Sequence, residues 1–325
     1  MNIQHITVNT LPAYLCYLKS NIHFMSIITP FYLTKGDWIG ITCPAGYLER
    51  SKAQKCIDTL QKWGYQVLIG KTLENSSNNY FSASDEERAA ELQAMLDAPE
   101  IKAILCGRGG YGISRIIDQL DFRRFKKNPK WIIGFSDITL LHCHIHQQCK
   151  VASLHAPMAV AFNEGSNKYI RSIKETLSGI AHRYEIKKHP FNKLGKANGQ
   201  LVGGNLALIS HAIGTDSELK TKNKILYIEE IGEHYYQIDR MLLQLKRSGL
   251  LKNLAGLIVG HFSDIKDTVR PFGKSIEGII TEHVSEYGYP VCLGFPVGHE
   301  RENISLKNGA TYTLNVEKNK VTLSE

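Results

Sequence analysis

The chain has 325 residues, of which 43% are hydrophobic and 22% charged, and its formal net charge is +8. These values are those of an ordinary soluble globular protein, and the length predicts about two domains of roughly 150 residues each. The densest basic run, Arg123–Lys127, is too short for a nucleic-acid arm and is interpreted as a solvated loop before a strand. The short basic run gives no reason to expect a nucleic acid as a partner. No apolar run reaches the length of a membrane-spanning helix, so a membrane is not expected as a partner either. The seven cysteines include no C-x-x-C pair, which favours reduced thiols in a cytoplasmic protein.

The first 165 residues are predicted to hold an extension and then a regular alternation of strands and helices. Residues 1–24 carry no clear pattern and are interpreted as an N-terminal extension, with Met25 as the functional start. A nucleophile-bearing domain is expected over residues 25–165, with strands at 38–42, 65–70, 101–106 and 131–133. One of its helices ends at Gly64, and another opens with the capping box Ser84-Asp85-Glu86-Glu87. Strands that alternate with amphipathic helices predict an α/β fold with a parallel sheet, whose active groups lie at the carboxyl ends of the strands.

The alternation breaks near residue 165. Residues 166–198 are polar and rich in lysine, which is typical of a linker. A C-terminal domain is then predicted over residues 199–325, with strands at 225–228 and 257–260 and near Val291 and Thr311. Its helices are expected near residues 238–245 and 276–283.

Ser136 lies on the turn between the apolar run Trp131-Ile132-Ile133 and a predicted helix. The segment Gly134-Phe135-Ser136-Asp137 has the pattern of a nucleophile elbow, without the second glycine of G-x-S-x-G. A serine held there at the positive end of a helix can attack a carbonyl, and the next backbone N–H can hold the oxyanion. Most serines between a strand and a helix are only N-caps, so Ser136 gains weight only with a base and an acid later in the chain.

A glycine-rich loop, Gly107-Arg108-Gly109-Gly110-Tyr111-Gly112, follows the strand at 101–106. Its glycines let backbone N–H groups approach a reacting carbonyl, as an oxyanion hole requires. The loop can also bind a phosphate at a helix N-terminus, although it lacks the Walker lysine and the dinucleotide spacing. A tight turn without any function fits the same pattern.

Candidates for the acid and the base lie in the second half. Glu229 and Glu230 close the strand at 225–228, and only one of them should point inward, because neighbours on an extended chain face opposite ways. His299 stands in a loop with glycine and proline, which can aim its ring at a partner. The ordinary alternatives are a solvated turn for the glutamates and a surface or core position for the histidine.

Two further motifs carry less weight. His142 and His146 lie one helical turn apart, as in zinc sites, but no glutamate lies between them as in H-E-x-x-H, so a helix packed behind the elbow explains them better. Phe262-Ser263-Asp264 repeats part of the elbow, but no amphipathic helix follows it. We therefore rank Ser263 below Ser136.

Six motifs in this order resemble those of the LD-carboxypeptidases, also called murein tetrapeptide carboxypeptidases. Besides the glycine loop and the elbow, they are His155-Ala156-Pro157-Met158, Gly203-Gly204-Asn205-Leu206, Ile228-Glu229-Glu230-Ile231-Gly232-Glu233 and Gly294-Phe295-Pro296-Val297-Gly298-His299. The resemblance runs from about Gly36 to the C-terminus. Ala156 stands where glycine is usual, and Glu300-Arg301-Glu302 is more charged than the family pattern.

The resemblance implies a Rossmann-like N-terminal domain with a parallel sheet and a smaller β-rich C-terminal domain, with a catalytic triad split between them. Carried over by motif, Ser136 is the nucleophile, Glu229 the orienting acid and His299 the base. The activity implied is release of the terminal D-alanine from murein tetrapeptides in cytoplasmic cell-wall recycling, with a small peptide as partner and no metal or other cofactor. A homodimer is considered as the assembly.

Two sets of substrate contacts are expected with this chemistry. Backbone N–H groups of Gly109, Gly110 and Asp137 are the expected oxyanion donors. The free carboxylate of the substrate requires a cation, and the candidates are Arg108, Arg115 and Arg240, since arginine binds carboxylates in bidentate fashion.

Two alternatives remain open. One is a serine peptidase of the same family that cleaves a peptidyl-nucleotide antibiotic, as the microcin-immunity proteins do. The other is a non-catalytic two-domain binding protein whose glycine loop holds a phosphate. Release of an amino acid from a tetrapeptide distinguishes the carboxypeptidase from both.

Overall fold

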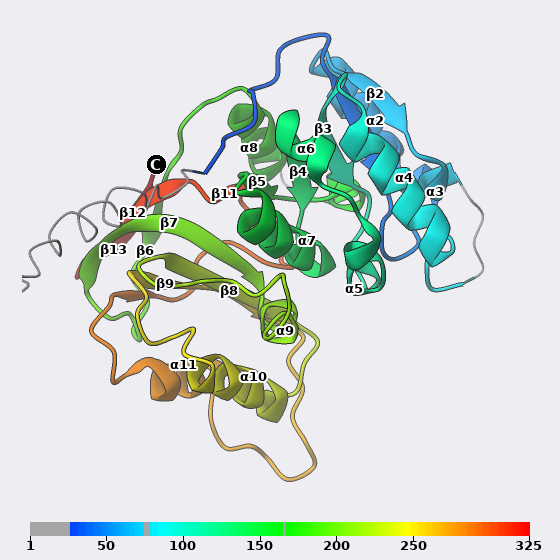
Figure 1. Cartoon of the computed structure of the whole chain (residues 1–325). Coiled ribbons are helices and arrows are strands. Elements are labelled where there is room, and N and C mark those ends of the chain that lie inside the picture. The colour runs from blue at the N-terminus through cyan, green and yellow to red at the C-terminus, as the bar shows by residue number, and fades with distance from the viewer. Residues whose placement is uncertain (1–26, 75–78, 165–166) are drawn as a thin grey trace, which may run out of the picture.

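The computed structural model describes residues 27–74, 79–164 and 167–325, which form two sheets with their helices (Figure 1). The predicted extension at 1–24 and the proposed start at Met25 lie outside these ranges. The first sheet has six strands in the order β11-β5-β4-β3-β1-β2, and the second has seven in the order β10-β9-β8-β7-β12-β13-β6. None of the helices in the described ranges is long and apolar enough to cross a membrane.

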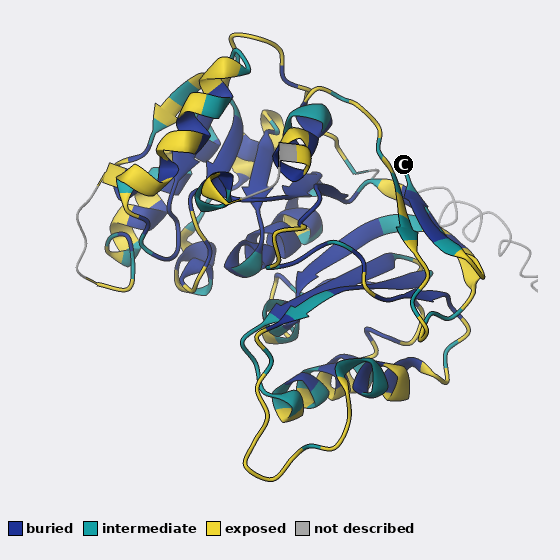
Figure 2. Ribbon diagram, turned by 180° about the vertical axis from the view of Figure 1, so that it is seen from behind, coloured by how far each residue is buried: buried dark blue, intermediate teal, exposed yellow. Residues whose placement is uncertain are grey.

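The first sheet is parallel except at β11, and helices cover both of its faces. In β3, Ala103 and Leu105 pack toward α2 and α8, whereas Ile104 and Cys106 pack toward α4 to α7. Figure 2 shows the central strands buried and the outer faces of these helices exposed, whereas the edge strand β2 is only partly buried. A sheet buried on both faces requires the continuous apolar runs seen in the sequence. The elements are β1 (Trp38–Thr42), α2 (Arg50–Lys62), β2 (Gln66–Ile69), α3 (Lys71–Glu74), α4 (Asp85–Asp97), β3 (Ile101–Cys106), α5 (Ile113–Ile116), α6 (Arg123–Lys127), β4 (Trp131–Gly134), α7 (Thr139–His144), β5 (Ser153–His155), α8 (Asn167–Leu177) and β11 (Leu306–Asn308).

The predicted capping box is confirmed. Ser84 Oγ accepts a hydrogen bond of 3.2 Å from Glu87 N, and Glu87 Oε2 accepts one of 3.0 Å from Ser84 N. These two bonds satisfy backbone donors that the first turn of α4 would otherwise leave unpaired.

The structure differs from two of the sequence expectations. The basic run predicted to be a loop forms helix α6, because Phe125 in its middle is buried in the core while the four basic side chains stay exposed. The stretch at 166–198, expected to be a linker, contains α8 and β6 (Arg183–Lys187). Ile170, Ile173 and Leu177 recur at helical spacing and are buried in α8, a pattern that the polar composition of the stretch hides.

The second sheet is half parallel and half antiparallel. Strands β7, β8, β9 and β10 pair in this order and are parallel. On the other side of β7, strands β12, β13 and β6 follow in this order, each antiparallel to its neighbour. Helices α9, α10 and α11 pack on one face of the parallel part. Its elements besides β6 are β7 (Gly195–Asn205), α9 (Leu206–His211), β8 (Ile225–Ile231), α10 (Tyr235–Arg247), β9 (Gly256–Ser263), α11 (Ile276–Val284), β10 (Val291–Cys292), β12 (Thr311–Val316) and β13 (Lys320–Ser324).

The two domains meet where β7 ends. Asn205 N donates a hydrogen bond of 3.0 Å to Thr139 Oγ1, the first residue of α7. Gly204 permits this approach, because its φ is +142° and a Cβ there would lie only 2.4 Å from Thr139 Oγ1. The second domain also supplies β11, which pairs with β5 at the edge of the first sheet. The carboxyl ends of both parallel sheets are thereby brought together.

We predict that Gly204→Ala destabilises the protein more than Gly249→Ala. Both glycines have a positive φ, but a Cβ at Gly249 meets nothing within 4 Å. The control should therefore cost only backbone strain, about 1–2 kcal/mol, whereas Gly204→Ala adds overlap with Thr139 and should cost about 3 kcal/mol or more. Thermal melting of both variants checks this, and equal melting temperatures would show that the contact is loose.

Candidate active site

Ser136 occupies a strained turn at the carboxyl end of β4. Its φ is +62°, in the left-handed region that residues other than glycine rarely adopt. A 3-10 turn over Ser136–Ile138 leads directly into α7. Phe135, and not Ser136, holds the N-cap position, and no side-chain cap is formed there. The alternative that Ser136 is only an N-cap is therefore wrong.

The glycine loop borders this serine. A Cβ on Gly109 would lie 2.9 Å from Ser136 Cβ and 3.1 Å from its Oγ, so only glycine allows the loop to come so close. Asp137 ties the two segments together, because its Oδ2 accepts a hydrogen bond of 2.8 Å from Ile113 N. Burial raises the pKa of Asp137 to about 6, although this backbone bond acts in the opposite direction. Gly110 follows next along the loop and has a φ of +95°.

Glu229, near the end of β8, is buried and pairs with the partly buried His299. His299 Nδ1 lies 2.7 Å from Glu229 Oε2, and Glu229 is fully buried. The other carboxylate oxygen, Oε1, is buried and has no hydrogen-bond partner among the described residues. The ring of His299 packs against that of Phe135, with 4.8 Å between the centroids. The pair thus lies beside the residue that precedes Ser136.

The surroundings of His299 favour its protonated form. Burial lowers its pKa, but the hydrogen bond and the charge of Glu229, with smaller contributions from the Glu230 and Glu300 charges, outweigh burial, and the pKa is raised above 6.5. A ring with a raised pKa is a stronger base than a free histidine.

Ser136 follows Phe135, whose ring packs against His299, but Ser136 and His299 are not hydrogen-bonded to each other. Ser136 Oγ makes no hydrogen bond to any residue in the described ranges. Catalytic hydrogen bonds are often long before the substrate binds and tighten in the complex. The site thus holds a serine, a histidine and a carboxylate, and the serine and the histidine are not yet in contact through a hydrogen bond.

Glu230 serves a different partner from Glu229. Its Oε1 accepts from Asn205 Nδ2 and its Oε2 from Ala207 N, both at 2.8 Å, so it holds the start of α9. The two adjacent side chains therefore point to different neighbours, as the strand geometry predicts. The solvated-turn alternative is wrong for both, because both are buried. Burial raises the pKa of Glu230 to about 7.

The three arginine candidates lie in different places. Arg108, on the glycine loop, donates to Tyr47 O at 3.0 Å. Arg115 is paired with Asp85, with 2.6 Å between Nη2 and Oδ2. Arg240 lies on α10, with its guanidinium over the ring of Tyr236 at 5.5 Å.

The less favoured motifs have structural partners. His142 Nε2 donates to Gly134 O at 2.9 Å, and His146 Nε2 accepts from Lys224 Nζ at 3.0 Å. Both belong to the helical segment behind the elbow, as expected. Ser263 ends β9, and its Oγ donates to Glu300 Oε1 at 2.7 Å. This link to the residue after His299 was not foreseen from the sequence.

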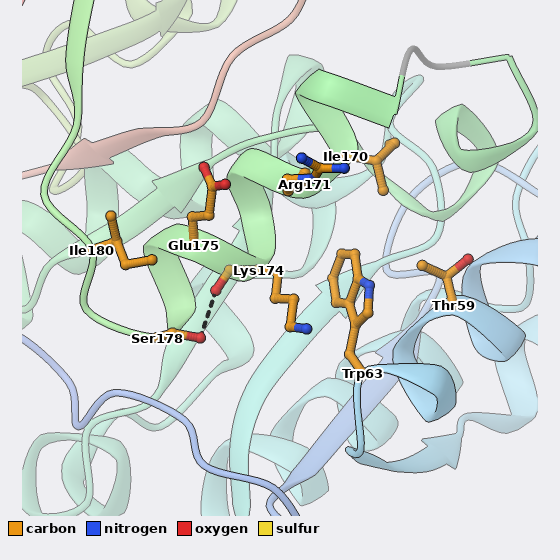
Figure 3. A pocket seen from close by; sticks show the side chains of 8 residues that line it. All are labelled: Thr59, Trp63, Ile170, Arg171, Lys174, Glu175, Ser178 and Ile180. Carbon is orange, nitrogen blue, oxygen red and sulfur yellow. Dashed lines mark hydrogen bonds between the residues drawn. The ribbon is translucent and has the colours of Figure 1, made fainter.

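Two pockets differ in their relation to these residues. One of about 440 Å³ lies between α2 and α8 (Figure 3) and contains none of the predicted site residues. There Lys174 points toward the ring of Trp63, 5.9 Å from its centroid. A smaller pocket of about 110 Å³ is lined by both His299 and Phe135, and it also holds Arg301, which sequence reasoning missed. The charged run that follows His299 was the available signal.

Comparison with known proteins identifies the family of both domains. Residues 39–156 match the model of the LD-carboxypeptidase N-terminal domain, and residues 198–314 match that of the C-terminal domain. The probable murein peptide carboxypeptidase of Bacillus subtilis (strain 168) is 37% identical over 291 residues, covering 88% of this chain and 91% of that protein. The muramoyltetrapeptide carboxypeptidase of Oxalobacter formigenes superimposes with a TM-score of 0.81 at 30% identity, covering 88% of this chain and 98% of that one.

A relative with a different name is also similar. The microcin C7 self-immunity protein of Escherichia coli is 24% identical over 329 residues, covering 90% of this chain and 94% of that protein. The two domain models together match more than half of the sequence and correspond to the two domains of the structure. With these matches and a relative at 37% identity, the chain belongs to the LD-carboxypeptidase family.

Proposed function

We propose that this protein is a serine-type carboxypeptidase that releases the terminal D-alanine of murein tetrapeptides in cytoplasmic cell-wall recycling. The observation that carries the proposal is the pair of buried Glu229 and partly buried His299, 2.7 Å apart, beside an elbow whose serine has a φ of +62°. The names of the relatives support the substrate class. The six described cysteines are free and buried, which fits a reducing compartment.

The proposed reaction uses the three residues in distinct roles. Glu229 accepts a hydrogen bond from the Nδ1–H group of His299 and so holds the tautomer in which Nε2 is the basic nitrogen. Nε2 takes the proton of Ser136 while Oγ attacks the carbonyl of the L-centre before D-alanine. Backbone N–H groups of Asp137, Gly109 and Gly110 hold the oxyanion. His299 then protonates the leaving amine as the C–N bond breaks, and water hydrolyses the resulting ester of Ser136.

We predict that Ser136→Ala abolishes hydrolysis and leaves folding intact. Loss of a triad nucleophile should lower kcat by about a thousandfold or more. Alanine keeps the same backbone and removes only a hydroxyl that bonds to no described residue, so the melting temperature should be unchanged. Mass spectrometry of a murein tetrapeptide after incubation reports both the activity and the bond cleaved.

Ser178→Ala is the matched control, because that exposed hydroxyl lies just past the end of α8, where it donates to Lys174 O and interacts with Tyr65, and it lines the pocket that contains none of the predicted site residues. Near wild-type turnover in Ser136→Ala would disprove the elbow assignment. A wild-type chain that leaves the tetrapeptide intact but cleaves a peptidyl-nucleotide would favour the microcin-immunity type of activity instead.

We predict that Glu229→Gln and Glu230→Gln separate chemistry from stability. The first should lower kcat by about 10³- to 10⁴-fold with a smaller change in KM, because an amide can present its NH₂ to the ring and favour the wrong tautomer. The second removes a charged acceptor at the start of α9 and should mainly lower the melting temperature. Steady-state alanine release and thermal melting are measured for both. An inactive Glu230→Gln with an active Glu229→Gln would reassign the acid.

The acid limb of the activity should lie above pH 6.5. Only neutral His299 can act as base, and its pKa is raised, because the pull of Glu229 exceeds the opposing effect of burial. Activity is therefore lost as the pH falls through a pKa higher than that of a free histidine. An NMR titration of the His299 ring in Ser136→Ala reads this pKa without turnover. Adding Glu229→Gln should lower it, and an unchanged value would mean that the carboxylate does not act on the ring.

A further inference from the structure

The proposed reaction fixes where the released residue must lie. His299 gives its proton to the leaving amine, so that nitrogen has to come within hydrogen-bond reach of the ring. The residue that carries it, with the free carboxylate of the substrate one carbon away, therefore lies next to His299. This step rests on the proposed function.

The small pocket beside His299 has the size and walls for such a residue. Its volume of about 110 Å³ is far below the 300–1,000 Å³ typical of drug-sized ligand sites, so it fits one small group. Phe135, Pro157 and Ala161 form its apolar side. The methyl group of an alanine can be buried against these side chains.

The loop that carries His299 also places Arg301 at this pocket. The loop is fixed at both ends by Asn303, whose Oδ1 accepts from Gly298 N at 3.2 Å and from His155 Nε2 at 3.0 Å. Arg301 lies between these anchors and lines the pocket. Its guanidinium makes no hydrogen bond or ion pair within residues 27–74, 79–164 and 167–325, so all five of its donors remain available.

The other charges at the pocket match an amino acid. Glu164 and Glu300 also line it, and Ser263 Oγ orients Glu300. Carboxylates alone would repel a carboxylate ligand. The leaving residue, however, gains a positive charge on its amine as it takes the proton, and these acids stabilise that charge. One cation and two acids thus suit a group whose carboxylate is negative and whose nitrogen is positively charged until the C–N bond breaks.

The arginines expected from the sequence are less suitable. Arg115 already binds Asp85 through both Nε and Nη2. Arg240 stacks on Tyr236 on α10. Arg108 lies on the glycine loop, which also carries the expected oxyanion donors Gly109 and Gly110, and it already donates to Tyr47 O.

We propose that Arg301 binds the terminal carboxylate of the substrate, in a pocket for one small residue that borders His299. The planar guanidinium fits a carboxylate with two parallel hydrogen bonds. This contact makes the protein select a peptide with a free C-terminus. Arg301 is thus the specificity residue for carboxypeptidase rather than endopeptidase activity.

The test compares a murein tetrapeptide that ends in D-alanine with the same peptide that ends in D-alaninamide. The wild type should favour the free acid in kcat/KM by about 10- to 100-fold, the range of a charge-assisted bond. Arg301→Gln should lose most of this preference, chiefly through KM on the acid, and should cleave the amide as the wild type does. Arg301→Lys should show an intermediate preference for the free acid, since lysine keeps the positive charge but cannot form the two parallel hydrogen bonds of a guanidinium.

Two control variants accompany it. Arg247→Gln removes another exposed arginine without a partner among the described residues, at the end of α10, and should keep the wild-type preference. Arg108→Gln tests the competing cation. The assignment is overturned if Arg301→Gln keeps the preference for the acid, if Arg108→Gln loses it, or if the wild type cleaves both peptides equally. If the wild type cleaves neither, the proposed function fails and this assignment fails with it.

Discussion

The hydrogen bond from Asn205 N to Thr139 Oγ1 is the contact on which the geometry of the site depends. Thr139 begins the helix that follows the elbow, and Asn205 ends the strand that runs beside β8. In the β7–β8 register Asn205 stands opposite Glu229, so fixing one strand end fixes the other. A single close approach, which requires glycine at 204, therefore determines where Glu229 and His299 of one domain lie relative to Ser136 of the other.

The adjacent residues Glu229 and Glu230 bind different partners at this junction. Burying two neighbouring carboxylates is costly unless each is hydrogen-bonded. Glu229 meets this requirement through His299, and Glu230 meets it through Asn205 and the start of α9. Since Asn205 in turn contacts Thr139, Glu230 supports the docking of the domains, while Glu229 holds the ring of His299. The raised pKa of Glu230, about 7, reflects the burial that this position imposes.

The loop that carries His299 is attached to both domains. Asn303 connects it to His155, which ends β5, and three residues later the chain enters β11 and pairs with that same strand. The chain thus rejoins the first sheet at β11, only a few residues after His299. This return limits the freedom of the ring and brings Arg301 to the mouth of a small pocket at the same time. Stored backbone strain at Ser136 is sustained by the packing of α7 and the glycine loop around it.

The sequence alone determined the elements whose signals are local. The apolar runs of β1 to β4, the capping box at Ser84 and the turn at Ser136 were all predicted, because each depends on residues close together in the chain. The residues of the site could be carried over by family resemblance, but no periodicity placed Glu229 near His299, seventy positions away. The role of Glu230, the return of β11, the helix in the expected linker and the pocket at Arg301 were decided by tertiary structure. Each arises from packing or hydrogen bonds between segments distant in sequence, where burial and partner choice override local propensity.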